Sequence, residues 1–560
     1  MKTGNHKKTD QSSNTGPTLP IVHLIGDPEE NYYQLGLKDR ELGKKLHLDA
    51  LTLLKSQSPI IDKFLKIGVK EYLKRNLFQN PNKYPRLKAY AEGMNEDFYD
   101  VAQVLMMPEL TSALPQWLPK LKPELLGCSS LMHLNDKKEV VHHRILDFPL
   151  KGSFDTLERA VLYEFKNSPR ILGFGSIGMP YPSITLITDR GMSLALHQKF
   201  SPVMNNDGMP IFELVEKLAQ YVKSSEDVIP FLKEHHSFTT WCLNMAFKNG
   251  DVLSVDVAGK DYFLEKFHLS EDSFLYFNNK LLDPSLNQKE ILPYGFHFYN
   301  EMREISAHKK IELMKKLETQ QRTDEEILKI FTSPLSHQIK NKKNQTWNLD
   351  TVTPSSLQVM SLNLANHQSH YLTGPAPKVF NHNILSLSEQ FRNPQQKLLK
   401  TKGKVDIEYQ LGLEELMNAQ KALDHDQYSL AYHSLQMSMD HFNHSSDTKF
   451  SDVVKFFFVI LQFLNDDHKK VRTYLRLELN SLENKLPIHL EDHRLLFIAR
   501  INYLLDGSFG IEEDKLDHPQ LKKLLNQEAK IPKIFYWRML KNFVSLRFDI
   551  VDIIYLHSAS

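Results

Sequence analysis

Three residue types that could form a nucleophilic site lie within a short stretch of the chain. Cys128, one of two cysteines, directly follows Gly127, and Arg144 and Asp147 come 16 and 19 residues after it. Two apolar segments separated by a charged turn lie between Cys128 and Asp147, which predicts a β-hairpin. Its second strand would carry Arg144 and Asp147 back toward the cysteine. A thiol, a guanidinium and a carboxylate would then meet at one end of the hairpin, which is a catalytic arrangement in outline.

A structural explanation has to be considered for each of these residues. A cysteine in an apolar strand is usually a small buried hydrophobic residue. We interpret Cys242, beside Trp241 in an apolar stretch, in that way. His142 and His143 are neighbours in a predicted strand, so their side chains point to opposite faces and cannot bind one metal ion together.

The composition limits the classes of function. A chain of 560 residues is too long for one core, and roughly three to four domain-sized units fit its length. Apolar residues make up 41% and charged residues 24%, as in soluble globular proteins. A formal charge of +1 argues against a nucleic-acid partner held by net charge. Two cysteines form neither a disulfide framework nor a CxxC zinc motif, so we expect no metal or cofactor.

Targeting signals are not evident. Residues 1–19 are mostly polar without an apolar core typical of a secretory signal, and we expect them to be disordered. The longest apolar run, 456–464, is far shorter than the roughly 20 residues that a membrane span needs. The expectation is a cytoplasmic protein without a membrane span.

The pattern of apolar residues divides the chain into parts with different predicted secondary structure. Residues 20–127 begin with a short strand and continue as helices, with a proline-rich stretch before Gly127. Residues 128–391 interleave strands and helices, which predicts a layered α+β domain. Its hairpins are predicted at 184–197, 241–256 and 357–372, the second with an Asn-Gly turn, and its helices at 211–234 and 297–333.

The last part of the chain predicts a separate helical domain. Residues 392–404 are polar and are interpreted as a linker, and 405–560 form an all-α domain. Its helices are predicted at 407–424, 427–443, 451–466, 469–485, 490–506 and 534–556. The segment 419–435 resembles the helix-turn-helix pattern of tetratricopeptide repeats. The alternative is an irregular bundle packed on the preceding domain.

Several short motifs, in order, resemble one enzyme group. His143-Arg144-Ile145-Leu146-Asp147 is similar to the Gly-Arg-Asn-Leu/Met-Asp motif of choloylglycine hydrolases, acid ceramidases and isopenicillin N acyltransferases, with its glycine and asparagine replaced. Residues 187–193 resemble the group's Asn-Glu-Lys-Gly-Leu turn, and 275–279 its Leu-Thr-Asn strand end. The segments 26–36 and 89–94 resemble the acyltransferase branch, whose members carry a segment before the nucleophile. The resemblance covers about residues 20–388.

The resemblance implies a fold and a mechanism. The group belongs to the N-terminal-nucleophile (Ntn) hydrolases, whose fold is an αββα sandwich. By this match Cys128 is the nucleophile, freed by self-cleavage after Gly127, and its own α-amine acts as the base. Arg144 would lower the pKa of the thiol, and Asp147 would accept a hydrogen bond from the α-amine. Asn278 would stabilise the tetrahedral intermediate.

Three further positions are weaker matches. Asn279 is one residue from Asn278 and would point the other way in a strand. Gln198 stands where the group has a second asparagine, and its amide has a longer arm. Arg303 matches a late arginine of the group, with a surface-helix residue as the preferred alternative.

These inferences predict a self-processing cysteine amidohydrolase or acyltransferase. Its substrate would be a small molecule with a linear amide, such as an N-acyl amino acid, an acyl peptide or a fatty amide. The replaced motif residues leave a second hypothesis. In that case the chain is a non-catalytic Ntn-fold binding protein, and its C-terminal helices are a platform for a protein partner.

Overall fold

The computed structural model describes residues 18–52, 59–113, 127–282, 294–335, 349–388, 391–510 and 515–555. Most of the predicted disordered N-terminus and the end of the proline-rich stretch lie outside these residues. Leu19, expected to be disordered, is buried, and its backbone exchanges two hydrogen bonds with the Gln396 side chain.

The first sheet, here sheet A, has eight strands and is antiparallel except at one edge. At that edge the first strand of the chain pairs parallel with β4, in the register Ile21 to Ala160. In sheet order the strands are β1 (Ile21–Gly26), β4 (Glu158–Phe165), β5 (Ile171–Ser176), β6 (Thr185–Thr188), β7 (Met192–Gln198), β8 (Thr240–Phe247), β9 (Asp251–Ala258) and β10 (Asp261–His268). The N-terminal segment is therefore part of this sheet.

The second sheet, sheet B, has seven antiparallel strands and contains the predicted Cys128 hairpin. In sheet order they are β11 (Phe274–Phe277), β2 (Gly127–Leu134), β3 (Val140–Asp147), β12 (Ser356–Asn363), β13 (Ser369–Leu372), β14 (Asn383–Ser388) and β15 (Gln395–Lys400). Strand β15 falls within 392–404, so the expectation of a linker there is corrected. Its polar, mostly exposed residues pair with β14 at a sheet edge, and polarity alone made them look like a linker.

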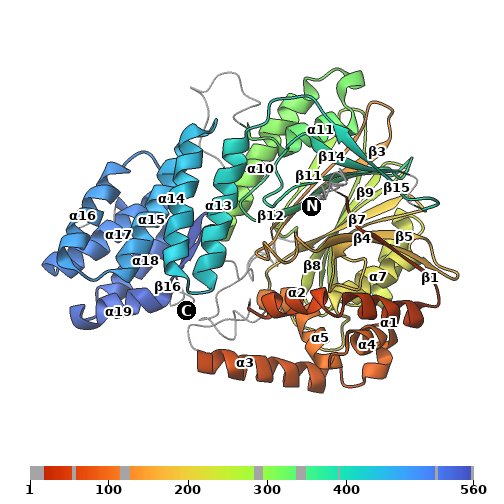
Figure 1. Cartoon of the computed structure of the whole chain (residues 1–560), viewed down its shortest axis with the longest axis horizontal. Helices are drawn as coiled ribbons and strands as arrows, with labels where there is room; N and C mark the ends of the chain where they lie inside the picture. The colour runs from red at the N-terminus through yellow and green to blue at the C-terminus, as the bar shows by residue number, and fades with distance from the viewer. Residues whose placement is uncertain are drawn as a thin grey trace, which may run out of the picture.

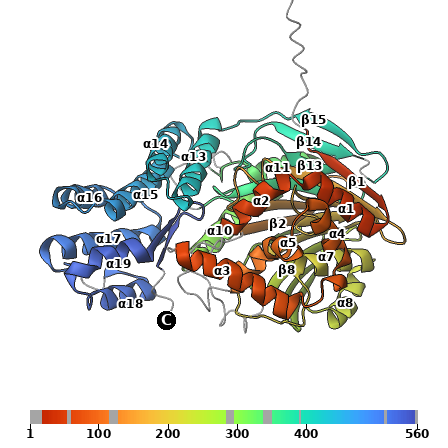
Figure 2. The ribbon, with the colours of Figure 1, turned by 60° about the horizontal axis from the view of Figure 1, so that its bottom comes forward.

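Three apolar cores separate four layers. One core lies between the two sheets and includes Met132, Leu172 and Leu362. A second joins the outer face of sheet A to helices before and after Cys128, and a third joins the outer face of sheet B to α10 and α11. Figures 1 and 2 show the sheets between these helical layers. This is the expected αββα sandwich.

The helices of the sandwich follow its layers. Those on sheet A are α1 (Pro28–Asp39), α2 (Leu42–Leu51), α3 (Pro59–Tyr72), α4 (Pro85–Met94), α5 (Phe98–Leu105), α6 (Met107–Ala113), α7 (Ile211–Tyr221) and α8 (Val228–Glu234). Those on sheet B are α10 (Tyr294–Lys315) and α11 (Asp324–Thr332). Two motif glycines let α1 and α4 touch, because a Cβ at Gly36 would lie 3.0 Å from the Gly93 Cα.

The described residues of the C-terminal part are mostly helical. Its helices are α13 (Ile407–Asp424), α14 (Tyr428–His444), α15 (Lys449–Asn465), α16 (Lys469–Ser481), α17 (Ile488–Asp506), α18 (Pro519–Glu528) and α19 (Lys533–Phe543). The predicted helix 534–556 is wrong in its second half, where β16 (Val544–Arg547) and β17 (Asp552–Tyr555) form a hairpin. Val544, Ile553 and Ile554 are β-branched, a residue type that favours strands. Figure 1 shows the helices beside the sandwich.

The apolar run 456–464 lies in α15, and most of its side chains are buried. Among the described residues, no helix combines the length and the apolar character needed to cross a membrane.

Candidate active site

Cys128 is the second residue of β2, and the antiparallel register of β2 with β3 sets its neighbours. Gly127 pairs with Asp147, and Cys128 pairs with Leu146. The hairpin predicted from the sequence is confirmed, and it returns Arg144 and Asp147 to the start of β2. Gly127, Cys128, Arg144 and Asp147 are all buried.

The thiol lies against the Arg144 guanidinium. Arg144 Nη2 is 2.8 Å from Cys128 Sγ and also donates to the Leu196 carbonyl on β7, at 2.7 Å. The thiol is 3.5 Å from the same carbonyl. Burial raises the pKa of Cys128 and outweighs the lowering effect of Arg144. Arg144 thus acts on the thiol pKa in the expected direction, while burial sets the net rise.

Arg144 retains binding capacity. Its Nε and Nη1 are buried and have no hydrogen-bond partner among the described residues. Buried donors without a partner are costly, so they point to a bound water or to a ligand oxygen.

Asp147 accepts three hydrogen bonds from side chains. Ser356 donates to one carboxylate oxygen at 2.5 Å, and Tyr299 and Arg303 donate to the other at 2.6 and 3.0 Å. Gly127 lies beside this cluster, where an added Cβ would press on the Tyr299 hydroxyl and lie 2.8 Å from Asp147 Oδ2. Only glycine fits before the cysteine.

We expected the α-amine of Cys128 to donate to Asp147. In the structure, the Cys128 backbone N–H donates instead to Asn279 Oδ1, at 2.8 Å. The Asn279 amide nitrogen donates to the Gln198 carbonyl at 2.9 Å. The Asn278 amide turns instead toward the Asn300 carbonyl, at 3.2 Å. The structure thus brings Asn279 to Cys128 in place of Asn278. Strand β11 ends at Phe277, before both asparagines, so strand alternation could not choose between them.

The Gln198 side chain does not reach the thiol through any described contact. Its Nε2 donates to the Pro108 carbonyl at 2.5 Å and lies 3.4 Å from Thr111 Oγ1, both in α6. Gln198 therefore meets the site through its backbone carbonyl, while its side chain holds α6 against β7.

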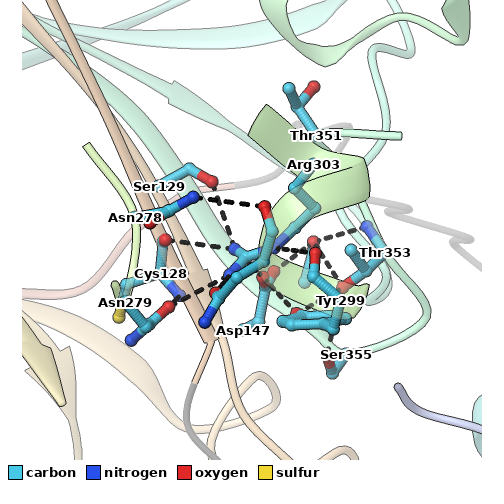
Figure 3. A network of polar contacts seen from close by, with 12 residues as sticks. Cys128, Ser129, Asp147, Asn278, Asn279, Tyr299, Arg303, Thr351, Thr353 and Ser355 are labelled. Carbon is cyan, nitrogen blue, oxygen red and sulfur yellow. Dashed lines mark hydrogen bonds and ion pairs between the residues drawn. The ribbon is translucent and has the colours of Figure 1, made fainter. Parts of the chain in front are cut away.

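Arg303 is fully buried, so its interpretation as a surface-helix residue is wrong. Its Nη1 donates to the Cys128 carbonyl and to Asp147, both at 3.0 Å, and its Nη2 donates to Asn279 Oδ1 at 3.0 Å. The guanidinium also lies over the Tyr299 ring, 4.1 Å from its centre. Figure 3 shows Arg303 among these partners. The sequence correctly predicted a helix around Arg303, but it did not predict that this helix, α10, packs on sheet B.

Two residues that sequence reasoning missed, Tyr299 and Ser356, complete the cluster. Tyr299 lies four residues before Arg303 on α10, so the two share a helix face, and this spacing could have revealed the pair. Ser356 opens an ordinary apolar strand, and nothing in its sequence context marks it.

The remaining candidates have structural partners. His142 contacts Ser130 and Ser193 between the sheets, whereas His143 contacts His133 on the other face of β3, as predicted. Burial raises the pKa of Cys242 to about 12. In the described part of the chain, one group has ligand atoms close enough for a metal ion: Asp466, Asp467 and His468, at the turn between α15 and α16.

Comparison with known proteins gives likenesses of structure alone. No protein-family model matches the sequence, and a search of curated proteins gives no match. A Caenorhabditis elegans N-acylethanolamine-hydrolyzing acid amidase ortholog is 13% identical, with 42% of this chain and 92% of that chain covered and a TM-score of 0.30. A mutant of the conjugated bile acid hydrolase from Clostridium perfringens is 11% identical, with 50% and 98% covered and a TM-score of 0.32.

A third solved structure, penicillin V acylase from Agrobacterium tumefaciens, is 9% identical, with 47% of this chain and 86% of that chain covered and a TM-score of 0.29. All three are Ntn hydrolases. The αββα arrangement itself follows from the strand order and the three cores of this chain.

Proposed function

We propose that the chain is a self-processing cysteine amidohydrolase or acyltransferase whose nucleophile is Cys128. The observation that carries the proposal is the set of contacts on this one residue. Arg144 contacts its thiol, Asn279 accepts from its backbone N–H, and Arg303 donates to its carbonyl. A cysteine buried only for packing does not need a guanidinium against its thiol.

The replaced motif residues bear on the alternative of a non-catalytic protein. His143 and Ile145 stand where the motif has glycine and asparagine, and both side chains lie on the α10–α11 face of β3. The Gln198 side chain likewise points to α6. These departures lie away from the thiol, which favours an enzyme over a decayed site.

Self-cleavage is the first step of the proposal. The Cys128 thiol attacks the Gly127 carbonyl carbon, an S–C bond forms, and the C–N bond breaks as the amine takes up the thiol proton. Water then hydrolyses this thioester, which frees the thiol and leaves a carboxylate on Gly127. The products are chains of 127 and 433 residues, which together make the 560 of the uncut chain.

The new α-amine is the base for the second step. It would keep the place of the Cys128 N–H beside Asn279 and take the proton of the thiol, since a free α-amine titrates near ~8. Arg144 would stabilise the resulting thiolate. The thiolate attacks the substrate carbonyl, the protonated amine gives its proton to the departing amine, and water or another amine resolves the acyl-enzyme.

The unpartnered N–H groups of Arg144 are the donors proposed for the substrate oxygen. A donor placed at the developing oxyanion contributes roughly 3 kcal/mol to the barrier reduction. The substrate class is a small molecule with a linear acyl amide.

A thiol-directed acyl probe tests the proposal. We expect the wild-type chain and Cys242→Ala, the matched control, to be acylated at residue 128, and Cys128→Ala to stay unlabelled. Intact mass should show the two pieces for the first two proteins and an uncut chain for the third. An uncut wild type without label would contradict the proposal and favour the binding-protein alternative.

A further inference from the structure

The C-terminal helical domain reaches the candidate site through the β16–β17 hairpin. Ile550 and Val551, in the turn between β16 and β17, lie against Phe298, Tyr299 and Met302 of α10. The gap between these side chains is about 10 Å³, no more than one water fills. The turn of α10 that carries Tyr299 and Arg303 is therefore packed on this hairpin.

A second contact runs through the segment before β12. Ser355 Oγ donates to the Asp549 carbonyl at 3.5 Å, and Thr353 Oγ1 lies 3.2 Å from the Tyr299 hydroxyl. The Ser355 carbonyl accepts from the N–H of Phe148, the residue after Asp147, at 2.8 Å. The hairpin turn thus reaches Tyr299, a donor to the Asp147 carboxylate, through Ser355 and Thr353. Figure 3 shows Tyr299, Thr353 and Ser355 beside Asp147.

A third contact holds the chain beyond Asp147. Lys151 pairs with Glu414 of α13 at 3.3 Å, and Lys421 of the same helix donates to the Lys151 carbonyl at 3.1 Å. The Lys151 side chain is largely buried. The domain therefore also contacts the chain four residues beyond Asp147.

The hairpin turn is itself strained. Val551 has a φ of 55°, a conformation that a β-branched residue rarely adopts. Its carbonyl accepts from His489 Nε2 at 3.2 Å, and the N–H of Phe548 donates to Gln420 Oε1 at 2.7 Å. Two helices thus force the turn into its shape, and strain held in this way is typical of functional sites.

We propose that the β16–β17 hairpin is a positioning element of the active site. Its turn fixes Tyr299 on α10, and Tyr299 and Arg303 in turn orient Asp147 and the Cys128 backbone. The C-terminal domain is then an integral part of the catalytic centre, and not only a platform for a partner. The inference rests on the proposed function for its effect on activity, while its effect on α10 is independent of it.

Two variants of the full chain test this role. Val551→Gly removes a side chain that lines the small gap facing α10 but accepts a φ of 55° without strain, so the turn can keep its shape. His489→Ala removes the ring stacked on Phe298, with 4.9 Å between ring centres, and the bond to the Val551 carbonyl. The matched control is Leu475→Ala, a buried residue of the same domain on α16, which Figure 1 shows far from α10.

Two measurements are made on each variant. Hydrogen exchange is measured on peptides that contain residues 298–303, and the maximal rate of Cys128 acylation is separated from the half-saturating probe concentration. In Val551→Gly and His489→Ala we expect faster exchange in 298–303 and an acylation rate about tenfold lower at unchanged half-saturation, since small displacements of a catalytic group cost this much or more. Leu475→Ala should change neither.

The outcomes separate the two proposals. Unchanged exchange in 298–303 for both variants would overturn the positioning role, and so would faster exchange with an unchanged acylation rate. Failure of the wild type to be acylated would refute the proposed function. If hydrogen exchange in 298–303 were still faster in Val551→Gly and His489→Ala alone, the positioning of α10 by the hairpin would remain supported. Equal effects in Leu475→Ala would reduce the hairpin to a general stabilising element and overturn the inference.

Discussion

Arg303 joins three groups that the proposed chemistry at Cys128 uses. It contacts the Cys128 carbonyl, the Asp147 carboxylate and the Asn279 amide oxygen, and no part of its side chain is exposed. The desolvation cost of a buried ion pair can exceed its Coulombic gain, so the Arg303–Asp147 pair contributes geometry more than stability. Removing one partner would leave a buried charge unpaired.

Gly127 gives the first prediction at the scale of single residues. In Gly127→Ala the new methyl group meets the Tyr299 hydroxyl and Asp147, so the cluster has to move apart. We expect self-cleavage, followed by intact mass over time, to slow at least about tenfold because the scissile bond is displaced. The free energy of unfolding should fall by about 1–3 kcal/mol, as for other overpacked sites.

The control for this change is Gly175→Ala in β5, where an added Cβ meets no atom within 4 Å. Cleavage of that variant should match the wild type. Wild-type cleavage kinetics in Gly127→Ala would show that the crowding around residue 127 has no part in processing.

At the scale of elements, one carboxylate ties α6 to two neighbours. Glu109 on α6 accepts from the N–H of Ile211, the first residue of α7, at 2.8 Å, and from Thr239, just before β8, at 2.7 Å. Burial raises the pKa of Glu109 to about 7, above the ordinary value of 4.5. The folded chain therefore holds this proton over a pH range in which the unfolded chain has lost it.

This pKa predicts a pH dependence of stability. Between pH 4.5 and about 7 the folded state binds more protons at Glu109 than the unfolded state, so the stabilisation present below pH 4.5 is lost as pH rises. The loss from this group is about 3 kcal/mol. In denaturant unfolding across this pH range, Glu109→Gln should lose less stability than the wild type as pH rises. The difference between the two proteins at pH 4 gives the cost of the substitution itself. Parallel curves for the two proteins would refute the assignment.

The sequence predicted elements whose pattern is local. The Cys128 hairpin, the three hairpins in 184–372 and the helices from Ile407 to Asp506 are found at their predicted places. Strand β15 was missed because an edge strand needs few apolar residues, and its pairing partner is not visible in its own sequence. The β16–β17 hairpin was hidden because its apolar residues also fit a helical spacing.

The candidate site was predictable only along the hairpin. Arg144 and Asp147 follow from strand geometry, since both lie on the strand paired with Cys128. Asn279 and Arg303 come from segments more than 150 residues away, and which face they present depends on packing between layers. Such long-range packing leaves no periodic signal.

At the scale of the whole molecule, the N-terminal piece is built into the sandwich. Its β1 is an edge strand of sheet A, and Asp39 on α1 forms a buried bidentate pair with Arg159 on β4, at 2.5 and 2.7 Å. Tyr32 also donates to Glu216 on α7 at 2.9 Å. A cut at Gly127 would leave these contacts in place.

We therefore predict that the two pieces stay together after cleavage and elute as one species in gel filtration. Asp39→Asn removes the charge opposite Arg159, which should cost about 3–5 kcal/mol and promote separation of the pieces. The control, Asp100→Asn, breaks an exposed pair with Lys70 in the same piece and should cost at most about 1 kcal/mol. Separation of the wild-type pieces under native conditions would contradict the prediction.

The parallel pairing of β1 with β4 also sets the order of the folding reaction. The uncut chain alone supplies every strand of sheet A, and its folding does not depend on protein concentration. After a cut at Gly127, the same sheet would need two molecules to meet, so refolding would become second order and its yield would fall on dilution. The cut protein would then remain folded because it unfolds slowly, since a dissociated N-terminal piece can rebind only in a bimolecular step.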